Sequence, residues 1–248
     1  MQTTMRRPSP SPPTTGMIPT ADLSPTPHTG PTMKIIDRHQ LIEQLNWRYA
    51  TKQYDPARKI PAADWAALEE ALVLTPSGYG LQPWTFLIVD DPKVRAELLL
   101  ASHGQPQVVD ASHLVVFATK TNYSEADLDT YIDLMAKVRN VAPQSLDGLR
   151  NMALRSVVQG KSDTERRHWA VNQTYIALGN LVTSGALLGI DATPMEGFEK
   201  NRYDEILELR ARGLATSVIA TLGYRNATDK YATLPKVRLP HGTVVQHV

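Results

Sequence analysis

The architecture of this chain follows from one segment, Thr183-Ser-Gly-Ala-Leu-Leu-Gly-Ile-Asp-Ala-Thr-Pro-Met-Glu-Gly-Phe198. It ends a long apolar helix, turns at Gly189, runs extended through Ile190–Thr193 and then enters a Pro-x-x-Gly turn. Proline fixes its own φ and glycine lets another surface approach closely. We therefore expect Pro194–Gly197 to point backbone N–H groups at a bound group.

The helix before this turn is predicted over Asp163–Leu188 and begins with acidic residues. From Tyr175 onward it is nearly all apolar or small. A helix that is apolar all round is buried on every side. We expect this helix to be the central column of the fold or of a dimer.

The remaining elements follow from apolar periodicity and from turn residues. Helices are predicted at Ile35–Arg48, Pro61–Leu74, Pro92–Ala101, Glu125–Val138, Ser145–Val158 and Tyr203–Gly213. Strands are predicted at Thr85–Val89, His113–Lys120 and Ala215–Leu222, with a β-like tail at Thr243–Val248 that adds an edge strand. Residues His103–Asp110 are predicted to form a loop.

Composition excludes several classes of protein. The chain has 248 residues, 42% of them hydrophobic, and a net charge of +1, which argues against a nucleic-acid binder. It has no Cys, so disulfides and thiolate catalysis are excluded, and a cytoplasmic location is expected. No apolar run is long enough for a membrane span. No second His lies at metal-ligand spacing from His113, so no metal is predicted.

Residues 1–33 differ in composition from the rest, since they hold eight of the 18 prolines and many Ser and Thr. Such a segment cannot bury enough surface to offset its ordering entropy. We interpret it as a disordered extension or as an over-called start with Met33 as the first functional residue. A weak targeting sequence around Arg6 and Arg7 is the alternative. Residues 34–248 are predicted to form the folded domain.

Four cations come in two close pairs from the two ends of the folded region. Arg48 and Lys52 are four residues apart and share a face if the first helix continues that far. They either compensate the helix dipole or bind a phosphate or anionic ring. Lys236 and Arg238 alternate with Val237 and share one side of an extended segment. Converging pairs of this kind neutralise a phosphate.

Polar side chains in two loops are candidates for binding a heterocycle. Ser77 and Gln82 lie in a loop rich in Gly and Pro, and Gln105 and Gln107 lie in another. The Gly78-x-Gly80 pair lacks the rest of a dinucleotide fingerprint and no strand precedes it, so a Rossmann site is rejected. Since no side-chain nucleophile, paired carboxylate or metal cluster is present, a cofactor is expected to carry the chemistry.

These motifs occur in the order found in a known family. They are Arg48-Tyr-Ala-Thr-Lys52, Pro76-Ser77 with Gln82-Pro-Trp84, Asp110-Ala-Ser-His113, Ala177-Leu-Gly-Asn180, Pro194-Met-Glu-Gly-Phe198 and Ala232-Thr-Leu-Pro-Lys-Val-Arg-Leu-Pro240. The chain from about Lys34 to its end resembles the FMN-dependent nitroreductases. It is most similar to the oxygen-insensitive NAD(P)H nitroreductase / dihydropteridine reductase group.

The resemblance implies an α+β nitroreductase-like fold, with a central mixed or antiparallel sheet flanked by helices and a long buried central helix. It implies a homodimer with two FMN at the subunit interface. NADH or NADPH would pass a hydride to FMN N5, and a nitroaromatic, quinone or pterin would be reduced in a ping-pong reaction, with no catalytic side chain. The alternative is an FMN-binding or storage module with little turnover.

The resemblance also implies the residues of the site. Cofactor-binding positions are Arg48, Tyr49, Ala50, Lys52, Ser77, Gly78, Gln82, Gln105, Gln107, Pro194, Met195, Glu196, Gly197, Lys236 and Arg238. Lys52 and Gln107 would also contact the nicotinamide substrate. Tyr49 and Ala50 stand where the family often has His-Ser, and Gly78 and Gly80 replace a Ser and an Asn. The family's aromatic gate is not visible between Val138 and Ser145.

Overall fold

A four-stranded antiparallel sheet with the strand order β1-β2-β4-β3 forms the centre of the fold. The computed structural model describes residues 36–248, so the predicted extension at 1–33 and the alternative start at Met33 lie outside the described residues. The strands are β1 (Trp84–Ile88), β2 (His113–Lys120), β3 (Asp191–Met195) and β4 (Leu214–Gly223). All three pairings are antiparallel, which confirms the antiparallel form of the predicted sheet.

The burial of each strand agrees with its place in the sheet. In the central strands β2 and β4, Val115, Phe117 and Val218 are fully buried, as their continuous apolar runs predict. The edge strand β3 contains Pro194, which has no N–H to donate to a ladder and is tolerated at an edge. The turn at Pro194–Gly197, which is predicted to face a ligand, therefore begins in an edge strand of the sheet.

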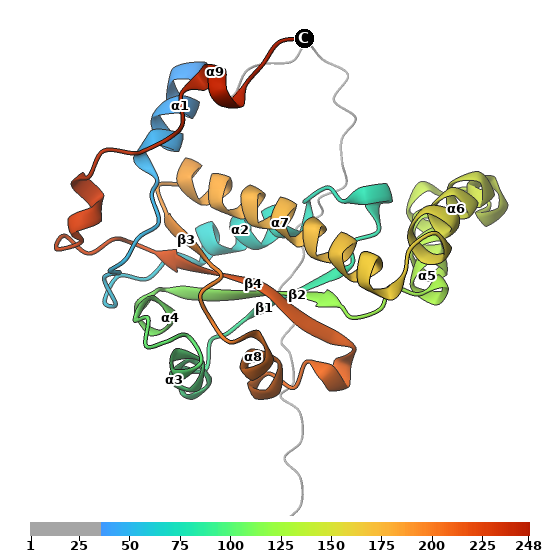
Figure 1. The fold of residues 1–248 in the computed structure, drawn as a ribbon, viewed down its shortest axis with the longest axis horizontal. Helices are drawn as coiled ribbons and strands as arrows, with labels where there is room; N and C mark the ends of the chain where they lie inside the picture. The colour runs from blue at the N-terminus through green and yellow to red at the C-terminus, as the bar shows by residue number, and fades with distance from the viewer. Residues whose placement is uncertain (1–35) are drawn as a thin grey trace, which may run out of the picture. The chain divides into compact units, whose positions relative to one another are not determined.

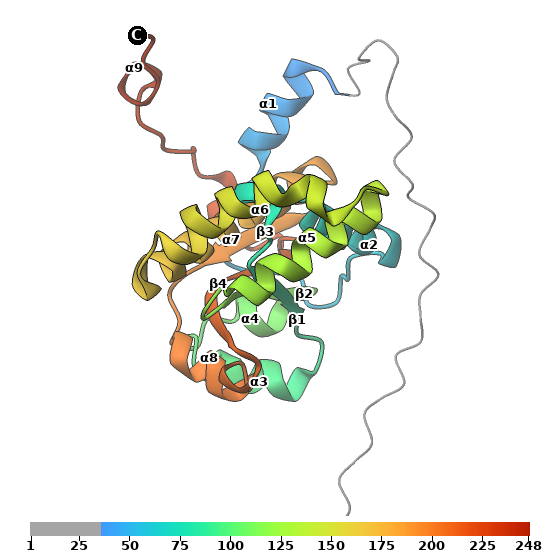
Figure 2. The ribbon, with the colours of Figure 1, turned by 90° about the vertical axis from the view of Figure 1, so that its right-hand side faces the viewer.

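Helices cover both faces of this sheet (Figure 1). Helices α2 and α7 lie on one face, and α3, α4 and α8 lie on the other, an arrangement also visible from the side in Figure 2. The helices are α1 (Arg38–Trp47), α2 (Ala62–Val73), α3 (Pro92–Leu100), α4 (Gln107–Asp110), α5 (Glu125–Arg139), α6 (Asp147–Ala153), α7 (Asp163–Leu187), α8 (Lys200–Ile206) and α9 (His241–Val244). No helix within residues 36–248 is both long and apolar enough to cross a bilayer.

Helix α7 is the long central helix that the sequence predicts. It starts at a capping box in which Ser162 and Glu165 satisfy each other's backbone N–H groups, and it is followed by Gly189 with φ +69°. Its inner face is fully buried, but the prediction of burial on all sides is wrong for a single chain. Tyr175, Ile176 and Leu187 are 38–45% exposed. One apolar face of α7 is therefore left uncovered.

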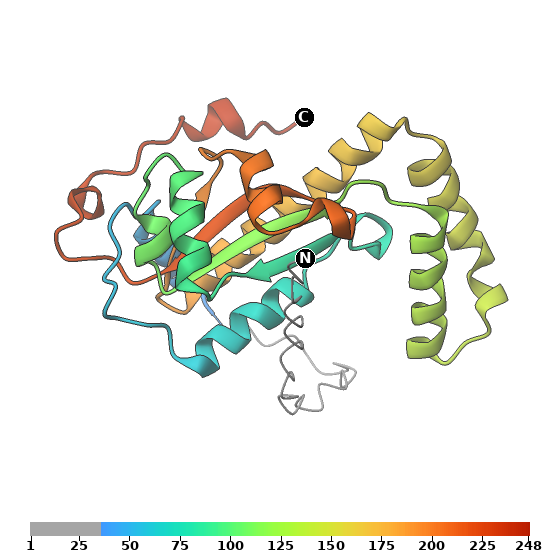
Figure 3. The ribbon, with the colours of Figure 1, turned by 90° about the horizontal axis from the view of Figure 1, so that it is seen from below.

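Residues 125–159 form a helical hairpin that lies beside the sheet rather than over it (Figure 3). The single helix predicted over Ser145–Val158 is wrong. The segment divides into a 3₁₀ turn at Pro143–Leu146, α6, and a π-helical turn at Leu154–Gln159. A proline at the first position favours the tight 3₁₀ turn. At the other end, the Arg155 carbonyl lies 2.3 Å from where a Cβ on Gly160 would be, so only glycine fits.

Three other predictions of secondary structure need correction. Residues Gln107–Asp110, predicted as loop, form the short helix α4. The helix predicted over Tyr203–Gly213 starts earlier and ends at Ile206, because the buried carboxylate of Asp204 turns away to accept from the Thr216 N–H at 2.6 Å. The tail at Thr243–Val248 is not a strand. Pro240 instead begins the short helix α9, since proline suits the position before a helix.

Candidate functional site

The segment after α1 carries the first pair of cations away from the helix. Helix α1 ends at Trp47, and Arg48 has extended φ and ψ of −69° and 142°. The helix does not continue to Lys52, so the condition under which Arg48 and Lys52 would share a helical face is not met. The segment is instead fixed against the sheet by Tyr54, which is buried and whose hydroxyl donates to the Thr221 carbonyl at 2.8 Å.

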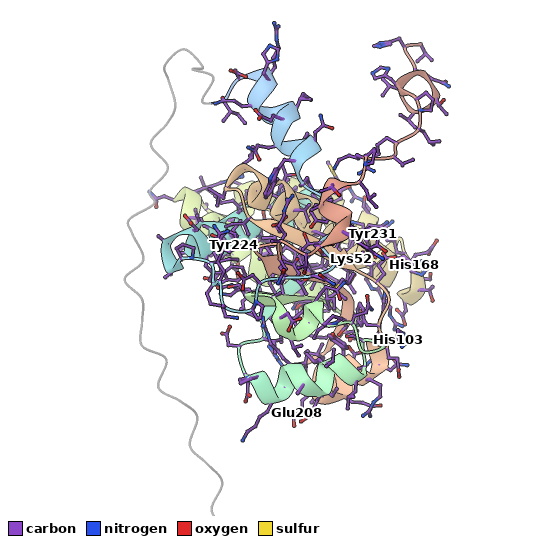
Figure 4. All side chains as sticks on the ribbon, turned by 90° about the vertical axis from the view of Figure 1, so that its left-hand side faces the viewer. Lys52, His103, His168, Glu208, Tyr224 and Tyr231 are labelled. Atoms are coloured by element: carbon purple, nitrogen blue, oxygen red, sulfur yellow. The ribbon has the colours of Figure 1, made fainter. Side chains whose placement is uncertain are left out.

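A cavity of about 400 Å³ lies where this segment meets the C-terminal segment. It is lined by residues from 46–52 and from 231–238, and Figure 4 shows Lys52 and Tyr231 beside each other there. The two predicted pairs of cations meet in it, together with two neighbouring predicted positions: Arg48, Tyr49, Ala50, Lys52, Lys236 and Arg238. The predicted convergence of the two chain ends is what the structure shows.

The cavity holds more positive charge than its own residues neutralise. None of its four cations forms an ion pair within residues 36–248. The Lys236 ammonium donates to the Arg48 carbonyl, and Arg48 Nε is buried with no acceptor. Burial and the neighbouring Arg238 lower the pKa of Arg48, while burial, Arg48 and Arg238 lower the pKa of Lys236. An anion with several acceptor oxygens would relieve both the repulsion and the unpaired donor.

Asp229 joins the two segments and was not identified from the sequence. It is 3% exposed and accepts from the Lys52 N–H at 2.7 Å, the Gln53 N–H at 3.1 Å and the Tyr49 hydroxyl at 2.9 Å. Burial alone would raise the pKa of Asp229, but the backbone donors Lys52, Tyr231 and Gln53 lower it. The local sequence around Asp229 gives no signal of this role, because the donors that link it to the first segment are 176–180 residues away in sequence.

Acid is expected to separate the two segments through Asp229. Because its folded pKa is lowered, its contribution to stability is complete above the ordinary carboxyl pKa of about 3.9 and is lost as the pH falls through the folded value. Asp229→Asn should therefore cost stability at pH 7 and cost much less at pH 3. Urea unfolding of both proteins at the two pH values measures this. An equal difference at both pH values would contradict it.

A second link was also missed by the sequence interpretation. Asp191 at the start of β3 is 2% exposed, and its carboxylate accepts from Arg225 Nη2 at 2.6 Å and from Arg225 Nε at 3.0 Å. The Arg225 guanidinium also lies over the rings of Trp47 and Tyr49, at 4.2 and 4.6 Å from their centroids. This side chain thus fixes the end of α1 to the edge of the sheet.

The turn after β3 lies next to this cationic cavity. Thr193 Oγ1 donates to the Thr51 carbonyl at 2.9 Å, which joins the base of the turn to the segment that carries Arg48 and Lys52. Neither the Glu196 nor the Gly197 N–H donates to a backbone acceptor within residues 36–248. These two N–H groups are therefore available to an acceptor outside the described backbone, as the prediction for this turn requires.

The two glutamines near α4 differ in their surroundings. Gln105 Nε2 donates to the Gly197 carbonyl at 2.7 Å, so this side chain holds the turn. Gln107 is 5% exposed, and its Oε1 is buried without a donor. The unpaired acceptor makes Gln107 the better candidate for contact with a ligand, because buried polar atoms are otherwise almost always satisfied.

The predicted residues Ser77, Gly78 and Gln82 do not line the cationic cavity of their own chain. Ser77 Oγ accepts from the Gln82 N–H at 3.0 Å, and the Gly78 N–H donates to Gln173 at 2.8 Å. The Gly78 N–H is therefore already used within the chain, while the Ser77 hydroxyl accepts and has no recorded acceptor of its own within residues 36–248. A single chain brings together the cations and the turn, but not this loop.

The fold and the cavity define a class: an α+β protein that offers a phosphate-sized cluster of cations and free backbone donors at the open edge of its sheet. The model of the nitroreductase family matches residues 45–224. This match covers more than half of the chain, and the chain belongs to the nitroreductase family.

Relatives agree with this assignment. A protein of Staphylococcus haemolyticus assigned as an NAD(P)H nitroreductase is 33% identical over 219 residues, covering 84% of this chain and 97% of its own length. The major NAD(P)H-flavin oxidoreductase of Aliivibrio fischeri is 30% identical over 208 residues, covering 81% and 94%. A structure from Exiguobacterium sibiricum, assigned as a nitroreductase and solved with FMN, has a TM-score of 0.71 at 20% identity, covering 88% and 100%.

Proposed function

We propose that this protein is an FMN-dependent NAD(P)H oxidoreductase that reduces a nitroaromatic, quinone or pterin by a ping-pong mechanism. The observation that carries the proposal is the cluster of four cations without ion pairs, with the buried and unpaired Nε of Arg48 among them. The residues fit a ribityl phosphate, because they supply two guanidinium groups for bidentate contacts and two ammonium groups as point charges. Residues 34–248 would be the FMN-binding domain, in the cytoplasm.

The residues around the cavity divide into those that hold the cofactor and those that meet the substrates. Arg48, Lys52, Lys236 and Arg238 would bind the phosphate and the pyrimidine end of the flavin. The unused N–H groups of Glu196 and Gly197 are the donors that we assign to the N5 side. When bound there, FMN would supply the redox chemistry that links oxidation of NADH or NADPH to reduction of the acceptor. Lys52 and the buried Oε1 of Gln107 would orient the nicotinamide.

A homodimer with FMN at the subunit interface is part of the proposal. Its support is the uncovered apolar face of α7, where Tyr175, Ile176 and Leu187 are exposed. Gly179 also lies on an open side of α7, since a Cβ there would meet nothing within 4 Å. A second copy would bury this face. It would also explain why the loop with Ser77 and Gly78 does not line the cationic cavity of its own chain.

The alternative is a flavin-binding or storage module with little turnover. One observation favours it: the Gly78 N–H is already used by Gln173, so the loop offers fewer contacts to the ring. Tyr49 likewise donates to Asp229, and burial with that bond raises the pKa of Tyr49 to about 12. Neither of these two hydrogen bonds involves the side chains of the four cations.

The purified protein is expected to be yellow, and the colour should bleach when NADH or NADPH is added under argon. Adding menadione should then restore the yellow colour, and NADH or NADPH should be oxidised steadily. A colourless protein to which FMN does not bind would overturn the proposal. Retention of FMN with negligible NAD(P)H oxidation would support the storage module instead.

A further inference from the structure

The turn at Pro194–Gly197 is built on a rigid base. Met195 pairs with Ile219 at the end of β3, and the Phe198 N–H donates to the Glu196 carbonyl at 2.9 Å to close the turn. Met195 and Phe198 are buried, while Glu196 and Gly197 are exposed. The backbone on both sides of the exposed peptide is therefore fixed, and the orientation of that peptide depends on what holds Glu196 and Gly197.

Two side chains hold this exposed peptide from opposite faces of the sheet. The Tyr175 hydroxyl, on α7, donates to the Glu196 carboxylate. Gln105, directly before α4, donates from Nε2 to the Gly197 carbonyl at 2.7 Å and to the Ser102 carbonyl at 3.1 Å. Figure 1 shows α7 and α4 on opposite faces of the sheet. Each layer of helices thus supplies one contact to the turn.

The contact from Tyr175 also controls where the Glu196 charge lies. Burial and the Glu196 carboxylate raise the pKa of Tyr175 to about 12, so the phenol stays protonated and remains the donor. A carboxylate released from Tyr175 could accept from the N–H groups of Glu196 and Gly197, which have no backbone acceptor within residues 36–248. Tyr175 keeps the carboxylate away from donors that the site needs.

We propose that Tyr175 is a positioning residue, which fixes the Glu196–Gly197 peptide so that its N–H groups stay aimed at the flavin and favour its reduced state. The inference rests on the proposed function for the presence of FMN. It goes beyond that function because Tyr175 lies on the outer part of α7 and is not one of the cofactor-binding positions. Its bond is exposed in a single chain, and the side chain would lie at the proposed dimer interface, so the tests measure the turn and the flavin directly rather than global stability.

The first test uses the protein without FMN. In Tyr175→Phe, exchange of the Phe198 amide should accelerate by about tenfold, the size expected for losing one charge-assisted bond that closes the turn. Glu196→Gln retains an oxygen that accepts from Tyr175 but loses the charge assistance, so its exchange should lie between those of wild type and Tyr175→Phe. Tyr79→Phe removes a hydroxyl from an equally exposed tyrosine, 38% in both cases, and should leave Phe198 unchanged.

The second test uses the protein loaded with FMN. The midpoint potential of the flavin should fall by about 30 mV in Tyr175→Phe, a tenfold weaker preference for the reduced state of a two-electron couple. The affinity for oxidised FMN should change less than about twofold, because the phosphate contacts are intact. A yellow Tyr175→Phe protein with unchanged potential and unchanged Phe198 exchange would overturn this inference alone. A colourless wild type would overturn the proposed function as well.

Discussion

The double variant Lys236→Ala/Arg238→Ala is expected to lose FMN during gel filtration, with an affinity two to four orders of magnitude below wild type. Each side chain contributes a charge-assisted contact of about 1.5–3 kcal/mol, and about 1.4 kcal/mol corresponds to a factor of ten. The two losses should not add fully, because Arg238 repels Lys236 and Arg48 in the free protein and lowers the pKa of both. Fluorescence titration of the apoprotein with FMN measures the affinity.

The chain offers a matched control for this variant. Lys200 and Arg202 have the same spacing and are exposed on α8, on the other face of the sheet (Figure 1). Lys200→Ala/Arg202→Ala removes the same formal charge and should leave FMN affinity within about twofold, since exposed charges at a distance are screened by salt. Equal FMN affinity in the two double variants would refute the phosphate clamp.

Arg225→Ala is expected to lower the free energy of unfolding by about 3–5 kcal/mol, the cost of leaving a buried carboxylate without its partner. Asp191 is 2% exposed and would keep only the backbone N–H of residue 225 as a donor at 2.8 Å. The variant also loses the stacking of the guanidinium on Trp47 and Tyr49. FMN affinity should fall too, because Arg48 would no longer be held beside the sheet.

Urea unfolding measures this loss, and the slope against urea should be unchanged if the folded state is otherwise intact. Arg202→Ala is the control, because Arg202 pairs with Glu205 at the surface, where the two side chains are 58% and 60% exposed. This pair should contribute less than about 1 kcal/mol to the free energy of unfolding. Asp191→Asn in the Arg225→Ala background should recover part of the stability, since it removes the unpaired charge. A loss below about 1 kcal/mol in Arg225→Ala would show that the pair does not hold the two segments.

The sequence predicted the fold well where one local signal dominates. Helix α7 has a capping box at Ser162 and a glycine at its end, and β2 is a continuous apolar run, so both were located within a residue. The prediction from sequence failed where the end of a helix depends on contacts with residues distant in the chain. Asp204 ends α8 by binding Thr216, and Arg48 leaves the helix because the following segment is anchored at Thr221 by Tyr54. No periodicity in the local sequence contains that information.

The candidate site shows the same division. The spacing of charges predicted the two pairs of cations, and the family resemblance predicted that they share one site, where the structure brings them into one cavity. The residues that hold those cations in place were not, since Asp229 and Arg225 act on partners 34 to 180 residues away. Tyr175 was noted only as the start of an apolar run, and its bond to Glu196 depends on the packing of α7 against β3.

The cavity formed by residues 46–52 and 231–238 has a consequence for biosynthesis. A ribosome must translate nearly the entire polypeptide before Asp229 can capture the amides of Lys52 and Gln53. A nascent chain therefore cannot form this cavity before residues 231–238 have been synthesised. Prematurely terminated products that stop before Asp229 would be folded in part yet unable to take up flavin.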